Sequence, residues 1–162
     1  MKITVFGSGY VGLVTAACFS EIGHEVCCVD IDQNKIAKLK QGKIDIFEPG
    51  LKEMVLRNQK QQRLKFTFNL EQAVNFSNFI FICVGTPQTQ EGSADLQSVF
   101  SVVSSIARDM TRNKVIVVKS TVPPGTGLEI QSLFREKLKN NNLSVQVTYN
   151  PEFLKEGCAI ND

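Results

Sequence analysis

The sequence has few of the features that mark whole classes of protein. It has no tryptophan, one histidine and nearly balanced charge, with 18 Lys and Arg residues against 16 Asp and Glu residues. The net charge of +2 is too small to indicate a nucleic-acid partner, and the basic residues are spread along the chain. No apolar run of about 18 residues and no signal-peptide pattern is present, so we predict no membrane span and, by default, a cytoplasmic location.

Cysteine is limited to five residues without CxxC spacing, and we predict no metal site. Four of the cysteines lie within apolar segments: Cys18, Cys27, Cys28 and Cys83. Such thiols fit small core side chains in a reducing compartment, whereas Cys158 lies outside any core pattern. The lone His24 lies in a predicted turn, where a solvated side chain is the simplest interpretation.

The most informative motif that is present is a glycine-rich turn near the start of the chain. Gly7-Ser-Gly9-Tyr-Val-Gly12 follows a short apolar strand and precedes a helix-like segment. Glycines at this spacing allow a tight turn, close approach of a pyrophosphate to the backbone, and close packing of helix on strand. Because glycine-rich turns also occur for packing reasons alone, the context has to support the prediction of a dinucleotide site.

A second strand supplies that context. The apolar segment 25–29 ends in Asp30, 18 residues after Gly12, close to the ~20-residue spacing of the carboxylate that binds a ribose 2′-hydroxyl. Asp32 adds a second negative charge, and no arginine stands there to receive a 2′-phosphate. This pattern favours NAD over NADP, although Asp30 could also be an exposed strand-end residue without a ligand.

Strand-like and helix-like segments alternate along the whole chain. The predicted strands cover 1–6, 25–29, 65–68, 79–84, 115–118 and 145–149, and the predicted helices cover 13–22, 34–40, 52–59, 70–74, 96–110 and 128–138. This alternation predicts an α/β fold, a Rossmann-type doubly wound and mostly parallel sheet with helices on both faces. We expect one domain over residues 1–162.

Unusual loops follow the carboxyl ends of the predicted strands. Thr86 and Thr121 each lie next to proline, where a hydroxyl could bind a phosphate, a ribose or a water, or could be an ordinary turn residue. Glu152 follows Asn150-Pro151 and could orient a water or act as a base, or could cap a helix or form a salt bridge. Since ligands of such sheets bind along this edge, one shared site explains these loops best.

Five motifs in this order resemble the N-terminal half of the UDP-glucose/GDP-mannose dehydrogenase family. They are GSGYVG at 7–12, EPGL at 48–51, VGTP at 84–87, STVPPGT at 120–126 and NPEFLKEG at 150–157, and they span nearly the whole chain. The resemblance implies an NAD-dependent oxidation of the C6 hydroxymethyl of a nucleotide sugar, with UDP-glucose the preferred candidate, to a carboxylate. It implies two NAD+ consumed per sugar and a homo-oligomeric full-length enzyme.

The resemblance also assigns roles to positions in this sequence. The cofactor would be held by the fingerprint, by the acid and lysine after the second strand, by the VGTP loop and by two later residues: Gly7, Gly9, Tyr10, Val11, Gly12, Asp30, Lys35, Val84, Gly85, Thr86, Thr121 and Glu156. Thr121 and Glu152 would be catalytic and hold a water near the reacting carbon. The sugar nucleotide would contact the stretch Tyr149, Asn150, Pro151, Glu152 and Phe153.

The sequence departs from the family pattern in its extent. Family members carry a nucleophilic cysteine, a catalytic lysine, a connecting helix and a C-terminal domain beyond the region matched here, and Cys158 does not match that nucleophile. We therefore expect NAD binding without complete catalysis by these 162 residues. A stand-alone NAD-binding or sensing module and, less favoured, a small hydroxyacid-type dehydrogenase with Glu152 as base remain alternatives.

Overall fold

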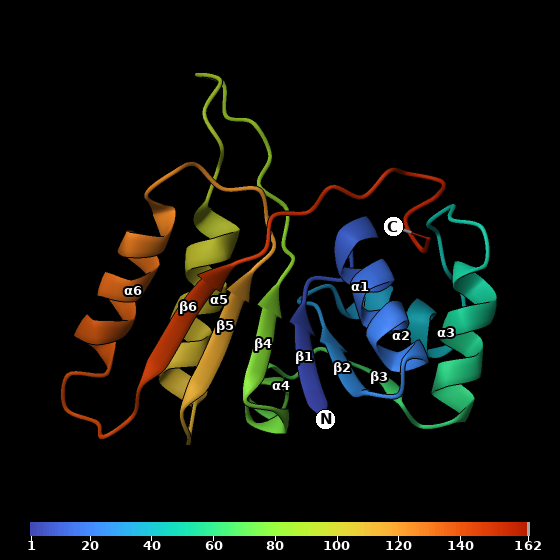
Figure 1. Cartoon of the computed structure of the whole chain (residues 1–162), viewed down its shortest axis with the longest axis horizontal. Coiled ribbons are helices and arrows are strands. Elements are labelled where there is room, and N and C mark those ends of the chain that lie inside the picture. Colours follow the sequence, from blue (N-terminus) through green and yellow to red (C-terminus); the bar gives the residue numbers. More distant parts are fainter. Residues whose placement is uncertain (162) are drawn as a thin grey trace.

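The computed structural model describes residues 1–161, which form one parallel sheet covered by helices (Figure 1). The six strands are β1 (Lys2–Phe6), β2 (Glu25–Val29), β3 (Leu64–Thr67), β4 (Phe79–Ile82), β5 (Lys114–Val118) and β6 (Val145–Tyr149). Their order in the sheet is β3-β2-β1-β4-β5-β6, and every neighbouring pair is parallel. The predicted fold class is confirmed, and the strand order reverses between β1 and β4.

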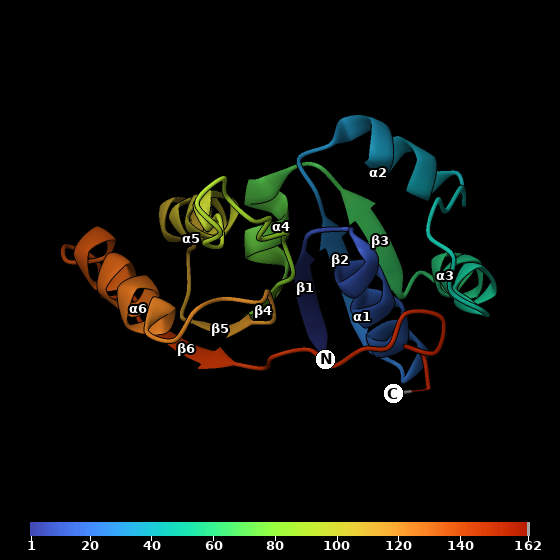
Figure 2. The same cartoon turned by 90° about the horizontal axis from the view of Figure 1, so that it is seen from above.

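Helices cover both faces of this sheet. They are α1 (Tyr10–Glu21), α2 (Gln33–Lys40), α3 (Leu51–Lys60), α4 (Leu70–Phe76), α5 (Gln97–Asp109) and α6 (Thr126–Lys137). Seen from above, α1 lies on one side of the sheet and α4 and α5 lie on the other (Figure 2). Buried residues accordingly form two clusters, one built by α1, α2 and α3 and the other by α4, α5 and α6.

The inner strands β1 and β2 are apolar because both of their faces are covered, whereas the edge strands β3 and β6 carry exposed residues. In β1, Val5 is fully buried in the cluster built by α1, α2 and α3, while its neighbour Phe6 belongs to the cluster built by α4, α5 and α6. In β2, Cys28 belongs to the first of these clusters and Val29 to the second. The thiols Cys27, Cys28 and Cys83 are buried, as the apolar pattern predicts, and Cys158 is exposed.

Connections at the carboxyl edge bring distant segments together. The Gly7 amide donates to Val29 O, and the Cys83 amide donates to Phe6 O, so the ends of β1, β2 and β4 are tied to each other. Between β4 and α5, residues 88–94 form a hairpin that projects beyond this edge (Figure 1). After β6 the chain runs back over the edge towards α1 and the loop before α3 (Figures 1 and 2).

Candidate cofactor and active site

The three fingerprint glycines are required for different reasons. Gly7 has φ +97°, and a Cβ there would lie 2.5 Å from the Cys83 carbonyl oxygen. Gly12 lies inside α1, where a Cβ would clash with Gly7 O, so it lets the helix pack against the turn. A Cβ added at Gly9 would meet no heavy atom within 4 Å, which leaves open space beside the backbone. Open space at the second glycine is what a pyrophosphate requires.

The N-terminus of α1 opens onto that space. Its N-cap residue is Gly9, and no side chain caps the helix or places a negative charge in its first turn. The first amides of a helix have no partner within the helix, and together with the helix dipole they favour an anion. The amides of Tyr10, Val11 and Gly12 are therefore available to a phosphate group.

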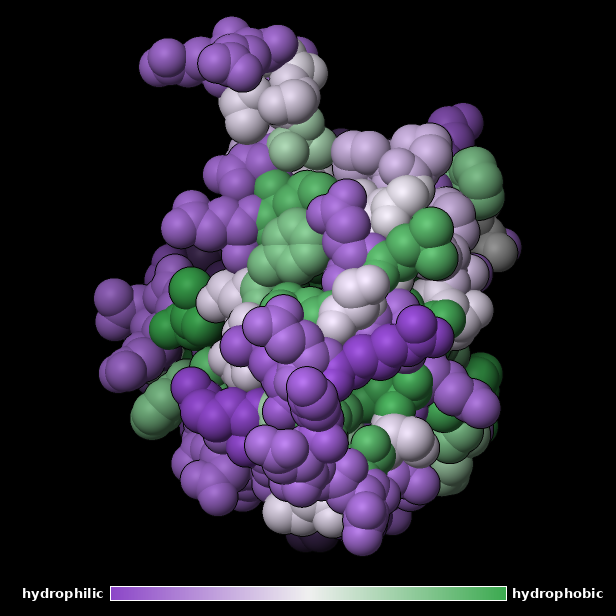
Figure 3. All heavy atoms as spheres, turned by 90° about the vertical axis from the view of Figure 1, so that its left-hand side faces the viewer, coloured by the Kyte–Doolittle hydropathy of each residue, from purple (hydrophilic) through white to green (hydrophobic). Residues whose placement is uncertain are grey.

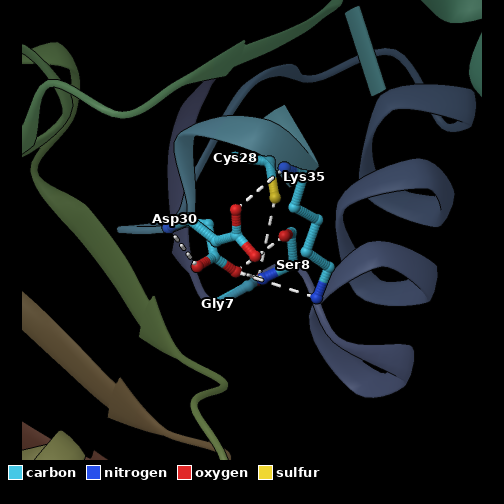
Figure 4. Close-up of polar contacts among 6 residues, drawn as sticks. Gly7, Ser8, Cys28, Asp30 and Lys35 are labelled. Atoms are coloured by element: carbon cyan, nitrogen blue, oxygen red, sulfur yellow. Dashed lines mark hydrogen bonds and ion pairs between the residues drawn. The ribbon is translucent and has the colours of Figure 1, made fainter. Parts of the chain in front are cut away.

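Asp30 is held in place by the fingerprint itself (Figure 4). Its Oδ2 accepts hydrogen bonds from the Ser8 amide at 2.8 Å and the Ser8 hydroxyl at 2.7 Å, and the Lys35 ammonium lies 3.9 Å away. Burial raises the pKa of the Asp30 carboxyl, but these hydrogen bonds, the Asp32 amide and Lys35 outweigh it, so the pKa lies below its usual value. The carboxylate is thus ionised and oriented at neutral pH.

A cavity of about 460 Å³ extends from this carboxylate. Gly7, Gly9 and Asp30 line it, together with Val84 and Gly85 from the loop after β4. The α5 helix contributes a mostly polar wall: Gln97, Ser98, Ser101, Val102 and Ser105. Its size and mixed lining match a small-molecule site at a topological switch point.

A smaller adjoining cavity of about 210 Å³ brings the predicted catalytic residues together. Thr121 and Glu152 line it with Tyr10 and Val11, so the fingerprint meets the loops after β5 and β6. Thr86 lines it too, and its hydroxyl donates to Thr121 O at 2.8 Å, which fixes the two loops to each other. One Glu152 oxygen accepts from the Leu154 amide at 3.0 Å.

The other predicted substrate residues lie elsewhere. Tyr149 and Pro151 line a separate cleft of about 490 Å³ beside α6, on the side of the molecule shown in Figure 3. Phe153 is 89% exposed, the Asn150 amide donates to Val118 O, and Glu156 is exposed with its charge acting on Tyr10. Within the predicted stretch 149–153, Glu152 lines the cavity beside the fingerprint, and Tyr149 and Pro151 do not.

Sequence reasoning missed three residues at this site. Ser8 orients Asp30, Lys119 lines the small cavity beside Glu152, and Glu48 accepts a hydrogen bond from Tyr10. The signal for Ser8 was a hydroxyl inside the glycine motif, and that for Lys119 was its place directly before the STVPPGT loop. Glu48 belongs to the EPGL motif, but its partner lies 38 positions away in sequence and could not be inferred.

Two further observations concern residues 1–161. No helix in that range is both long and apolar enough to traverse a bilayer. Within the same range, no three or more His, Cys, Asp or Glu side chains gather in a way that could bind a metal ion.

The family assignment rests on the whole chain. Residues 1–162 match the model of the UDP-glucose/GDP-mannose dehydrogenase family, NAD binding domain. The chain belongs to this family. As its NAD-binding domain, the chain uses NAD, in agreement with the open glycine turn, the uncapped α1 and the oriented Asp30.

Relatives of known activity agree with this assignment. The chain is 50% identical to UDP-glucose 6-dehydrogenase of Rhizobium meliloti and 49% identical to UDP-glucose 6-dehydrogenase TuaD of Bacillus subtilis. These matches cover 100% and 99% of the chain but 37% and 35% of those proteins. The family domain therefore spans a little over a third of the length of these relatives.

Solved structures show the same fold. A ternary complex of GDP-mannose dehydrogenase from Pseudomonas aeruginosa superimposes with a TM-score of 0.92 at 39% identity, over 100% of this chain and 38% of that one. A UDP-glucose dehydrogenase from Pyrobaculum islandicum gives a TM-score of 0.89 at 38% identity, over 99% of this chain and 38% of that one. Family members are NAD-dependent nucleotide-sugar dehydrogenases, and this chain corresponds to their N-terminal part.

Proposed function

We propose that this NAD-binding domain serves the oxidation of UDP-glucose at C6 to UDP-glucuronate. The overall change takes one sugar, two NAD+ and one water, and the new carboxylate oxygen comes from the water. The choice of UDP-glucose among nucleotide sugars is supported by the 50% and 49% identity to UDP-glucose 6-dehydrogenases. Five free cysteines support a reducing compartment such as the cytoplasm.

The observation that carries the proposal is the small cavity shared by Thr121, Glu152 and the fingerprint. NAD+ supplies a hydride acceptor when it is bound. The chain's own residues do the remaining work: the α1 amides and Asp30 hold the pyrophosphate and ribose, and Lys35 lies beside the same carboxylate. The Thr121 hydroxyl can donate and accept hydrogen bonds and the Glu152 carboxylate can accept them, and together they orient a water towards the reacting carbon.

The cysteine chemistry of this chain limits what it can do alone. A thiolate that holds the aldehyde covalently prepares the carbon for the second oxidation, and the thiolate, not the thiol, is the nucleophile. Cys83 lines the small cavity, but burial raises its pKa to about 12, so it stays a thiol at neutral pH. We expect residues 1–162 to bind NAD+ and to give no steady oxidation of UDP-glucose.

Two experiments test the proposal. Calorimetry should detect NAD+ binding by the 162-residue chain, and NADH absorbance should show no turnover with UDP-glucose. A chimera in which this chain replaces the matching 35% of Bacillus subtilis TuaD should restore turnover. In that chimera Glu152→Gln should lower kcat at least about tenfold, equivalent to ~1.4 kcal/mol of transition-state stabilisation.

The controls separate binding from catalysis. NAD+ affinity of the Glu152→Gln chimera should equal that of the parent chimera, because the cavity near Asp30 is unchanged. A chimera that binds NAD+ but does not oxidise UDP-glucose would refute the proposed substrate. Steady turnover by the isolated chain would refute the requirement for chemistry outside it.

A further inference from the structure

A buried carboxylate joins the fingerprint to the segment that follows β6. Glu48, in the loop before α3, is 6% exposed. Its Oε2 accepts hydrogen bonds from the Tyr10 hydroxyl at 2.5 Å and the Gly157 amide at 2.8 Å, and its Oε1 accepts from the Ile160 amide at 3.3 Å. The Gly157 amide also reaches the Tyr10 oxygen at 3.1 Å. Three segments far apart in sequence therefore meet at one side chain.

The charge of Glu48 is stable at neutral pH. The hydrogen bond from Tyr10 lowers the pKa of Glu48 against the effect of burial, and the amides of Ile160, Gly157 and Ala159 lower it further. Burial and the Glu48 carboxylate raise the pKa of the Tyr10 hydroxyl, which keeps its proton. The cluster is thus a charge-assisted set of hydrogen bonds, which are shorter and stronger than neutral ones.

Apolar packing holds the same segment on α1 and α3. Ala159 is 3% exposed, and Leu154 and Ile160 pack against the core cluster formed by α1, α2 and α3. Glu152, which lines the small cavity, lies between β6 and the first of these anchors, and Glu156 lies between Leu154 and Ala159. The position of Glu152 is therefore bounded by β6 on one side and by the Glu48 cluster on the other.

Tyr10 connects this cluster to the cofactor site. It is the first residue of α1, whose N-terminus has no side-chain cap, and it lines the small cavity with Glu152. A ligand that fixes the first turn of α1 also fixes the hydroxyl that holds Glu48. Binding free energies that are linked in this way are reciprocal.

We propose that Glu48 is a positioning residue that couples NAD+ binding at the fingerprint to the placement of the Glu152 segment. The inference rests on the proposed function, because the benefit of the coupling is a correctly placed Glu152. It gives the EPGL motif a physical role: a carboxylate at its first position accepts hydrogen bonds from both sides. The segment is then ordered when the cofactor is present.

Amide hydrogen exchange of the 162-residue chain tests the coupling directly. Saturating NAD+ should slow exchange at Gly157 and Ile160 about fivefold or more, which corresponds to the lower end of measured coupling between sites. Glu48→Gln keeps the size of the side chain but replaces one acceptor by an NH₂ group, so NAD+ should no longer slow exchange at these amides. NAD+ affinity should fall by the same factor. The matched control is Glu53→Gln, on the exposed part of α3, which should behave as wild type.

The outcomes distinguish this inference from the proposed function. If NAD+ binds the wild-type chain by calorimetry and the Gly157 and Ile160 amides exchange at the same rate with and without it, the coupling is refuted and the function is untouched. If Glu48→Gln retains the NAD+-dependent protection, Glu48 is not the coupling residue. In the TuaD chimera, Glu48→Gln should lower kcat at least about fivefold. Unchanged kcat there would also overturn the proposal.

Discussion

At the scale of single residues, we expect the carboxylate of Asp30 to set the choice between NAD+ and NADP+. Its side chain is 17% exposed and fixed by both donors of Ser8, so it cannot easily turn away from a 2′-phosphate. Like charges brought together at a binding site cost several kcal/mol. The positive charge of Lys35 would favour a phosphate, but its ammonium forms an ion pair with the Asp30 carboxylate at 3.9 Å.

Asp30→Ala should therefore change specificity as well as affinity. We expect NAD+ to bind about tenfold more weakly, because a hydrogen bond to a charged group is lost, and the preference for NAD+ over NADP+ to fall at least about tenfold. Calorimetric titration with each cofactor measures both effects. Ser8→Ala is the control: it retains the charge, so NAD+ affinity should fall while the preference for NAD+ persists. An Asp30→Ala chain that still rejects NADP+ as strongly as wild type would contradict this account.

At the scale of helices and strands, a buried lysine closes the end of a helix. Lys114, the first residue of β5, is 2% exposed, and its ammonium donates to Val74 O and Ser77 O at the end of α4, both at 2.5 Å. Burial lowers the pKa of Lys114 to about 8. The neutral amine keeps two N–H groups, enough for both carbonyls.

The lowered pKa makes stability depend on pH in a defined direction. Above pH 8 the folded chain releases the Lys114 proton, whereas the unfolded chain keeps it up to about pH 10.4. The unfolded state then binds more protons, so the contribution of this group to the free energy of unfolding rises between pH 8 and 10.

Urea unfolding of wild type and Lys114→Met should show a difference in the free energy of unfolding that grows with pH in this window. At pH 7 Lys114→Met should cost ~2 kcal/mol, because two buried carbonyls lose their donor. A pH-independent difference would refute the shifted pKa.

Element positions were largely predictable from periodicity, and the two helix starts that were predicted too late have a common cause. The sequence predicts helices from 13 and 128, whereas α1 begins at Tyr10 and α6 at Thr126. Each early turn contains a glycine that looks like a helix breaker. A Cβ at Gly12 would strike the backbone oxygen of Gly7, so only glycine fits there, and a Cβ at Gly127 would overlap the side chain of Tyr149 unless that ring moved. Close packing between elements is a tertiary interaction, and local helix propensity does not predict it.

At the scale of the whole molecule, the site also has features that the sequence predicts and features that depend on contacts between distant residues. Strand-end loops could be assigned to one edge because parallel strands place their carboxyl ends together, and the structure does bring Thr86, Thr121 and Glu152 to one cavity. The path of the chain after β6 could not be inferred, since it depends on Glu48 and on apolar packing against α1 and α3. Lys114 was missed for the same reason, because its partners are 40 and 37 positions away.

The two core clusters lie on opposite faces of one sheet, and this arrangement predicts a single cooperative unfolding transition. The strands β1, β2 and β4 contribute to both clusters, as Val5 and Phe6 do in β1, so losing one face exposes strands that the other requires. Ile36→Ala in α2 and Ile106→Ala in α5 truncate buried side chains, 1% and 0% exposed, in different clusters. Each should cost ~2–5 kcal/mol and move the same transition. Circular dichroism and hydrogen exchange should report one common unfolding transition in both variants. NAD+ at about 100 times its Kd should add ~2.7 kcal/mol to the free energy of unfolding of each variant. Two separable transitions in either variant would mean that the faces unfold independently.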